Sequence, residues 1–162
     1  MNLTNIKKLK PQLKASSLSG IDLQKLRDAG KKGIILDLDN TITLWKDTAI
    51  SKEAHEFIEQ ALKLGFSICL LSNAKKSRTA NIAAIYNLPF VSMAKKPMQN
   101  SYIRALAMLE LKADAVIAVG DQVFTDILGG NRAGCYTILV PPLGTREFIW
   151  TKFMRQLEKL VE

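Results

Sequence analysis

Two carboxylates spaced by two residues follow a run of apolar residues in the segment 34–41, Ile-Ile-Leu-Asp-Leu-Asp-Asn-Thr. A continuous apolar run is typical of a strand that is buried on both faces. In an open α/β sheet, ligands bind at the carboxyl ends of the strands, where Asp37, Asp39 and Thr41 would lie. Because neighbouring carboxylates repel each other, they are stable together only with a cation or a shared proton. The segment alone also fits a strand followed by an Asx-turn, which Asp and Asn favour.

Three later segments repeat this arrangement of an apolar run that ends in polar residues. The polar residues in question are Ser72 and Asn73 after 68–71, Lys96 after 90–91, and Asp121 and Asp126 after 115–119. With Asp37 and Asp39, they supply carboxylates, a hydroxyl and an amine. This set of groups is the one needed to bind a phosphate together with a divalent metal.

Four motifs of the chain resemble, in order, those of the haloacid dehalogenase (HAD) superfamily of phosphatases. They are Asp-Leu-Asp-Asn-Thr at 37–41, Leu-Ser-Asn at 71–73, Lys-Lys-Pro at 95–97 and Gly-Asp-Gln-x-x-Thr-Asp at 120–126. Within subfamily IIIA, the stretch 119–133, Arg146-Glu147-Phe148 and Thr151-Lys152 resemble the YqeG family, which is related to the HAD-type phosphatidylglycerophosphatases of mitochondria and plastids. The resemblance covers about residues 20 to 155, and it is specific because the four motifs occur in order, each at the end of an expected strand.

The resemblance implies a role for each motif residue. Asp37 would be the nucleophile that forms an aspartyl-phosphate, and Asp39 would protonate the leaving oxygen and later deprotonate water. The expected Mg²⁺ ligands are Asp37, Asp39 through its backbone carbonyl, Asp121, and Asp126, which would act through a metal-bound water or contact Lys96 instead. The expected phosphate-binding residues are Asn40, Thr41, Ser72, Asn73 and Lys96, of which Ser72 and Lys96 would also assist catalysis.

The alternation of apolar runs and helical periods predicts an α/β fold, a Rossmann-like three-layer sandwich of the HAD type with a mainly parallel sheet. Helices are expected at 51–65, 77–86, 100–109 and 125–134, and a strand at 136–140. The apolar face of the first of these helices is predicted to contain Ala54, Phe57, Ile58, Ala61 and Leu62. Only eleven residues separate Asp39 from Ser51, so no sizeable cap domain is expected. An open site suits a bulky or surface-bound substrate better than a small enclosed metabolite.

At 162 residues the chain is predicted to form a single domain, with a basic N-terminal arm or helix at 1–32, a phosphatase core at 33–145 and a C-terminal amphipathic helix at 146–162. The first 32 residues hold eight Lys or Arg against Asp22 and Asp28, a net charge of +6 out of +8 for the whole chain. Such a segment either binds an anionic surface, whether nucleic acid or lipid, or is a solubilising tail.

Both ends also carry apolar residues beside the basic ones. They are Leu3, Ile6, Leu9 and Leu13, which would share a face if the start of the chain were helical, and Phe148, Ile149, Trp150 and Phe153 near the other end. Each group suits either a lipid interface or packing on the sheet. Lys75, Lys76 and Arg78 are predicted to form a solvated face that attracts an anionic head group.

No apolar run approaches the length of a membrane-spanning helix. Cys69 and Cys135 lie in or beside apolar runs and are predicted to be buried and reduced. The expected location is the cytoplasm, peripherally on the inner membrane face, and a transit peptide at the start is the alternative.

These features, with the resemblance, predict a Mg²⁺-dependent phosphomonoester hydrolase whose favoured reaction is the conversion of phosphatidylglycerophosphate to phosphatidylglycerol. The alternatives are a phosphatase of a soluble phosphometabolite or nucleotide, and a nucleic-acid- or ribosome-binding protein on the same scaffold. Nucleic acid is the less favoured partner, because no signature with stacking aromatic residues is present. The sequence leaves the oligomeric state open.

Overall fold

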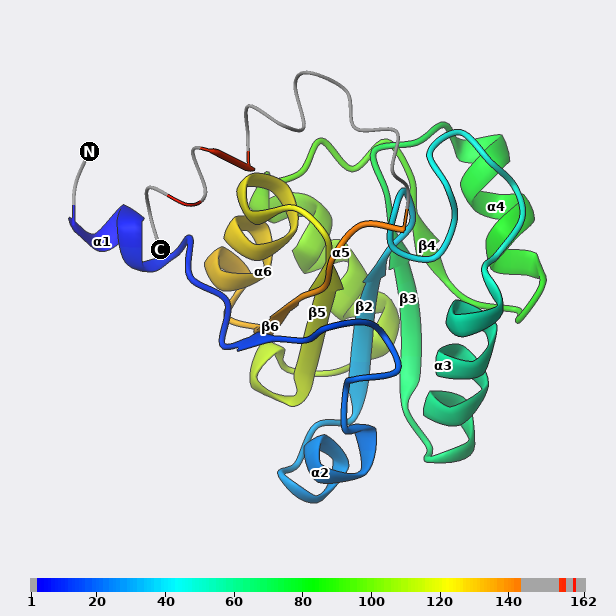
Figure 1. Cartoon of the computed structure of the whole chain (residues 1–162), viewed down its shortest axis with the longest axis horizontal. Helices are drawn as coiled ribbons and strands as arrows, with labels where there is room; N and C mark the ends of the chain where they lie inside the picture. Colours follow the sequence, from blue (N-terminus) through cyan, green and yellow to red (C-terminus); the bar gives the residue numbers. More distant parts are fainter. Residues whose placement is uncertain (1–2, 144–154, 157–158, 160–162) are drawn as a thin grey trace.

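The computed structural model of the protein describes residues 3–143, 155–156 and 159. Six strands form one parallel sheet in the order β1-β6-β5-β2-β3-β4 (Figure 1). The strands are β1 (Leu13–Lys14), β2 (Gly33–Asp37), β3 (Ser67–Leu71), β4 (Phe90–Val91), β5 (Val116–Gly120) and β6 (Tyr136–Leu139). The helices are α1 (Leu3–Lys7), α2 (Leu23–Asp28), α3 (Lys52–Lys63), α4 (Lys76–Ala84), α5 (Gln99–Leu109), η1 (Ala113–Ala115), η2 (Val123–Ile127) and α6 (Leu128–Ala133). The predicted α/β architecture is confirmed.

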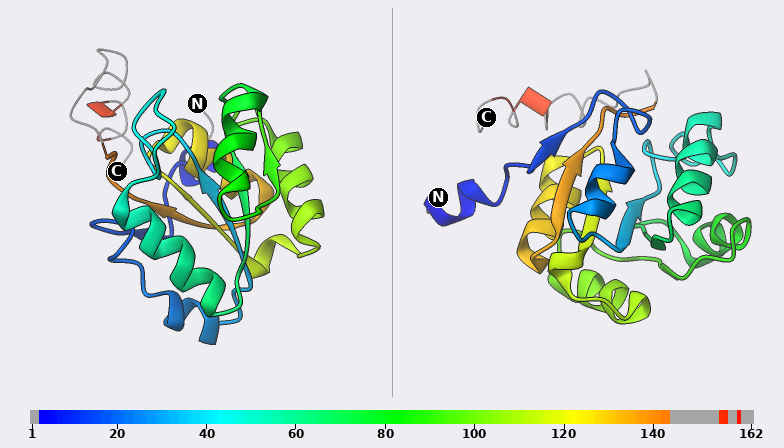
Figure 2. Two further views of the ribbon diagram at one scale, coloured as in Figure 1. Left: turned by 90° about the vertical axis from the view of Figure 1, so that its right-hand side faces the viewer. Right: turned by 90° about the horizontal axis from the view of Figure 1, so that it is seen from below.

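The sheet is covered on both faces, as the unbroken apolar strands require. Alternate residues of β2 point to opposite sides: Ile34 and Leu36 pack with buried residues of α2, α3 and α4, whereas Ile35 packs with those of α5. Figure 2 shows α3 and α5 on opposite sides of the sheet. The side chain of Asp37 follows the same alternation and therefore lies on the α5 side of the sheet.

Two of the sequence predictions for the helices need adjustment. Ser51 caps α3 by accepting a hydrogen bond from the backbone N–H of Ala54 at 3.1 Å, as expected. Leu62, however, is 38% exposed and lies outside the buried face of this helix. The predicted helix 125–134 begins as the π-helical turn η2 and continues as α6 to Ala133, after which Gly134 takes a left-handed conformation with φ of 88°.

The segment after α1 is held against η2 and α6 by apolar packing and hydrogen bonds. Leu9 is buried against Val123 and Ile127. The side-chain amide of Asn131 donates hydrogen bonds to the carbonyls of Lys8 and Lys10, at 2.7 and 2.9 Å. The helix α1 ends at residue 7, and Leu13 lies in β1. Leu3, Ile6, Leu9 and Leu13 therefore do not share one helical face.

Cys69 and Cys135 are buried free thiols, as predicted, and burial raises the pKa of each to about 12. Among the described residues, no helix is long and apolar enough to cross a membrane. The aromatic group predicted around residues 148–153 lies outside the described residues.

Candidate active site

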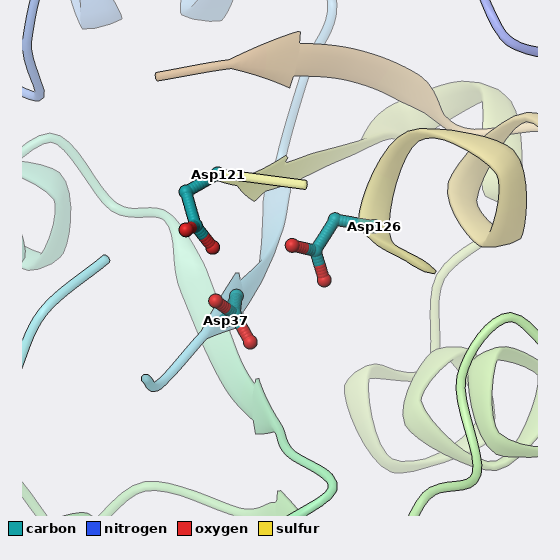
Figure 3. Close-up of side chains that lie close together, drawn as sticks. All are labelled: Asp37, Asp121 and Asp126. Atoms are coloured by element: carbon teal, nitrogen blue, oxygen red, sulfur yellow. The ribbon is translucent and has the colours of Figure 1, made fainter. Parts of the chain in front are cut away.

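Three carboxylates meet at the carboxyl edge of the sheet. Asp37 ends β2, Asp121 follows β5, and these two strands are hydrogen-bonded neighbours. Asp126 comes from η2 and points toward the other two (Figure 3). One carboxylate oxygen of each residue lies within 4.8 Å of the corresponding oxygens of the other two. Parallel pairing of β2 with β5 thus brings together residues that are far apart in the sequence.

Asp121 carries the least compensated charge of the three. Its side chain is buried, and its Oδ2 atom has no hydrogen-bond partner among the described residues. Its Oδ1 atom accepts a long hydrogen bond, 3.5 Å, from the hydroxyl of Thr41. Burial, followed by the nearby charges of Asp37 and Asp126, raises the pKa of Asp121 well above its ordinary value. A buried carboxylate in this condition is a position where a cation would be stabilising.

Lys96 joins two of the carboxylates. Its ammonium donates hydrogen bonds to Asp37 Oδ1 and, at 2.6 Å, to Asp126 Oδ1, and its side chain is only 4% exposed. Burial by itself lowers the pKa of Lys96, but the charges of Asp126 and Asp37 outweigh it and raise that pKa well above the ordinary value. Lys96 therefore remains protonated and supplies a fixed positive charge at the site.

The position of Asp126 depends on a glycine and a tyrosine. A Cβ atom at Gly120 would lie 2.3 Å from the Asp126 carboxylate carbon, so the absence of a side chain there makes room for it. The hydroxyl of buried Tyr102 donates to the backbone carbonyls of Thr125 and Asp126, each at 3.3 Å. Burial, and next the charge of Asp37, raises the pKa of Asp126 to about 6.

Asp39 points away from this cluster toward α4. Its carboxylate forms an ion pair with Arg78 at 2.6 Å. The guanidinium of Arg78 also donates to the carbonyl of Asp47 at 2.8 Å and to the hydroxyl of Thr43 at 3.1 Å. The solvated face predicted for residues 75–78 therefore does not include Arg78, whose side chain is 16% exposed and holds the β2–α3 loop.

A cavity of about 140 Å³ opens above the carboxylates. Its lining includes eight charged or amide side chains, a threonine and a tryptophan, namely Asp37, Asp39, Asn40, Trp45, Asn73, Lys96, Asp121, Gln122, Thr125 and Asp126. Thr41 and Ser72 are buried and stand outside this lining. Thr41 donates to Asp37 Oδ2 at 2.8 Å, and the Ser72 hydroxyl accepts the backbone N–H of Ala74 at 3.0 Å.

Most residues singled out in the sequence thus converge on one site, but others were missed. Arg78 and Trp45 are examples, because nothing in the helical or loop pattern distinguishes them from solvated residues. Tyr102 was also missed, because its spacing in α5 indicates burial without indicating that its hydroxyl reaches η2.

The sequence is similar to those of proteins named as phosphatases, and the fold is similar to that of a hydrolase. The sequence profile of the family described as "Mitochondrial PGP phosphatase" matches residues 1–142. Probable phosphatase YqeG of Bacillus subtilis (strain 168) is 36% identical over 138 residues, which cover 85% of this chain and 80% of that protein. Phosphatidylglycerophosphate phosphatase 1, chloroplastic, of Chlamydomonas reinhardtii is 29% identical over 144 residues, which cover 83% of this chain. The chain spans 54% of the length of that algal relative.

Among solved structures, a putative HAD superfamily (subfamily III A) hydrolase from Legionella pneumophila matches with a TM-score of 0.55 and 12% identity, over 98% of this chain and 88% of that one. At this identity the likeness concerns the fold. The family profile covers most of the chain, and each of the four motifs contributes a residue to the lining of one cavity, namely Asp37, Asn73, Lys96 and Asp121. The chain belongs to the mitochondrial PGP phosphatase family within the HAD superfamily, and it is a HAD-type phosphatase.

Proposed function

We propose that the protein is a Mg²⁺-dependent phosphomonoester hydrolase that acts through an aspartyl-phosphate at Asp37. The observation that carries the proposal is the buried cluster of three carboxylates, in which Asp121 Oδ2 lacks a partner among the described residues and Lys96 neutralises only part of the charge. Oxygen ligands alone favour a hard divalent cation such as Mg²⁺. Asp37 and Asp121 would hold this ion, with the backbone carbonyl of Asp39, and Asp126 would contact its bound water.

When bound, the ion would neutralise the negative charge shared by the carboxylates and the substrate phosphate. In the first step, an Asp37 oxygen forms a bond to phosphorus as the bond between phosphorus and the alcohol oxygen breaks. Asp39 gives its proton to that departing oxygen, for which it must exchange its partner Arg78 for the leaving group. In the second step, Asp39 takes a proton from water, which displaces phosphate from Asp37.

Lys96 contributes at both steps because its charge is fixed beside the attacking carboxylate. Asn40 and Asn73 line the cavity, and their side-chain amides would donate to phosphoryl oxygens. The buried hydroxyls of Thr41 and Ser72 would act from behind the lining, Thr41 by holding Asp37 and Ser72 by holding the loop that carries Asn73.

Phosphatidylglycerophosphate is the proposed substrate, with phosphatidylglycerol as the product and an anionic membrane as the place of reaction. The family description and the name of the algal relative support this choice. The absence of an inserted domain in the β2–α3 loop, residues 38–51, supports it too, since the cavity stays open to a bulky substrate. A soluble phosphate ester is the second candidate, because the cavity itself is small and polar.

The test is phosphate release from phosphatidylglycerophosphate in mixed micelles, compared with glycerol 3-phosphate and nucleotides. We expect Mg²⁺-dependent release from the lipid, loss in EDTA and recovery on adding Mg²⁺. Asp37→Asn should lower turnover by at least about 10³-fold, as removal of a nucleophile does in other hydrolases. Its thermal unfolding should show an intact fold, and the exposed change Asp114→Asn serves as the matched control.

Acid quenching during turnover should trap a phosphorylated protein that hydroxylamine cleaves, and Asp37→Asn should yield none. Full activity of Asp37→Asn, or undiminished hydrolysis in excess chelator, would refute the mechanism. Phosphate release from soluble esters alone would be consistent with the mechanism but would reject phosphatidylglycerophosphate as the substrate.

A further inference from the structure

Three loops at the carboxyl ends of β2, β3 and β4 contribute side chains to the cavity. They are residues 38–51, 72–75 and 92–98, all of which the structure describes, and we call them the rim (Figure 1). Trp45, Asn73 and Lys96 line the cavity from the first, second and third loop respectively. A surface that contacts the rim would therefore lie beside the cavity that contains Asp37.

The rim exposes large apolar side chains beside the polar cavity. They are Leu44 at 49% exposed, Trp45 at 46%, Met93 at 63% and Met98 at 53%. Two of these side chains come from the β2–α3 loop and two from the β4–α5 loop. Both loops also contribute side chains to the cavity lining. A group of exposed apolar side chains next to polar ones marks a surface that contacts a protein or a membrane.

The backbone that presents these side chains is held by hydrogen bonds. Arg78 fixes the first loop through the carbonyl of Asp47 and the hydroxyl of Thr43. The backbone N–H of Met93 donates to the carbonyl of Ala74 at 2.9 Å, which ties the third loop to the second. Hydrogen bonds therefore hold the backbone of the two loops that expose these apolar side chains.

The charge of the rim identifies its partner. Each loop carries an exposed lysine, Lys46, Lys75 or Lys95, and the Lys46 ammonium lies 4.3 Å from the centre of the Trp45 ring. The exposed acid of the rim is Asp47, whose carboxylate accepts the backbone N–H groups of the next two residues. A two-fold contact between copies of the chain would bring the same lysines together, which is unfavourable. An anionic bilayer instead pairs with the lysines and accepts the apolar side chains at its interface.

We propose that the rim is a docking surface that seats the cavity directly on an anionic membrane. In this orientation Leu44, Trp45, Met93 and Met98 enter the boundary between head groups and acyl chains, and the cavity faces the head groups. The proposal rests on the proposed function, because it explains how a lipid phosphate reaches a small polar cavity. It assigns the contact to the rim and not to the two ends of the chain.

Sedimentation with vesicles of phosphatidylcholine, with and without phosphatidylglycerol, tests the surface without turnover. The variant Leu44→Gln/Met93→Gln should bind the anionic vesicles on the order of tenfold more weakly, because interfacial binding scales with buried apolar area. Leu62→Gln/Ile85→Gln is the matched control: both side chains are exposed, at 38% and 53%, but lie where α3 and α4 end, away from the rim. Equal loss in both variants, or none in the rim variant, would overturn the proposal.

A second measurement follows the fluorescence of Trp45, which lies in the rim. The chain has two tryptophans, so the Trp150→Phe variant leaves Trp45 as its one fluorescent indole. Its emission should shift to shorter wavelength with anionic vesicles, and this shift should weaken as salt rises. Sedimentation of the protein without a shift would place the membrane contact elsewhere. A dimer in sedimentation velocity that Leu44→Gln/Met93→Gln dissociates, without vesicle binding, would show that a second copy covers the rim.

Docking and catalysis can fail separately. Asp37→Asn should bind anionic vesicles as the unsubstituted protein does, because docking requires no phosphoryl transfer. Vesicle binding through the rim without lipid hydrolysis would leave the docking surface and reject the proposed substrate. Hydrolysis of the lipid with unchanged binding by the rim variant would retain the proposed function and reject the docking surface.

Discussion

At the scale of single residues, the site depends on how charges are paired. Lys96 is hydrogen-bonded to Asp37 and Asp126, whereas one carboxylate oxygen of Asp121 has no partner in the part of the chain that the structure describes. Asp39 stands apart because Arg78 holds it. The proposed nucleophile and the proposed acid therefore pair with two different cations, Lys96 for Asp37 and Arg78 for Asp39.

Arg78 should matter for the step in which the leaving oxygen is protonated. A lysine has one charged nitrogen and cannot replace the contacts that Arg78 makes to Asp39, Thr43 and Asp47 together. We expect Arg78→Lys to slow the first step about 10- to 100-fold, the size of effect that misplacing a catalytic group by about 1 Å produces. The burst of alcohol released from an alkyl phosphate measures this step.

The loss should be smaller for p-nitrophenyl phosphate, whose leaving group needs no proton. Arg104→Lys, the same change at an exposed position of α5, should have no effect. An equal loss for both substrates would mean that Arg78 holds the loop without positioning Asp39.

At the scale of elements, the site depends on the close approach of α6 to α5. A Cβ atom at Gly129 would lie 2.3 Å from the ring of Tyr102, which is rigidly buried. Gly129→Ala should therefore lower the free energy of unfolding by about 1–3 kcal/mol, as overpacking of a core does. Denaturant unfolding measures this change. Gly20→Ala is the control, because the nearest atom there is a serine hydroxyl that can rotate away, and a change of less than about 0.5 kcal/mol is expected.

The sequence predicted the elements whose chemistry follows from topology. Asp37, Lys96 and Asp121 could be placed together because parallel strands end at one edge. The sequence could not reveal β1, since two residues carry no periodic pattern and their pairing with β6 is decided by tertiary contacts. Arg78 was misjudged for a similar reason: a cation on a helix has the same sequence pattern whether water or a loop surrounds it.

At the scale of the whole molecule, metal binding should be coupled to stability. The carboxylate cluster forms only in the folded chain, so an ion that binds there stabilises the fold by mass action, by about 2.7 kcal/mol at 100 times its Kd. We expect Mg²⁺ to raise the melting temperature and EDTA to reverse the rise, as measured by calorimetry.

Asp121→Asn should stabilise the metal-free protein and abolish its stabilisation by Mg²⁺. It removes a buried charge, so the metal-free melting temperature should rise, and the response to Mg²⁺ should disappear. A full Mg²⁺ response in this variant would place the ion elsewhere. Asp114→Asn should behave as the unsubstituted protein, because residue 114 is exposed and precedes β5, whereas Asp121 follows the other end of this strand.

The edge strand β1 has a consequence for the order of folding during synthesis. Gln12 accepts the backbone N–H of Thr137 at 2.7 Å across a separation of 125 residues. At a translation rate of 5–20 residues per second, the partner strand follows about 6–25 seconds later. During that interval Leu9 lacks its partners in η2 and Leu13 lacks its partner strand β6, so this segment is synthesised well before the elements on which it packs. Nascent chains that end before β6 should therefore be cleaved by protease in this segment, and chains that extend beyond β6 should resist.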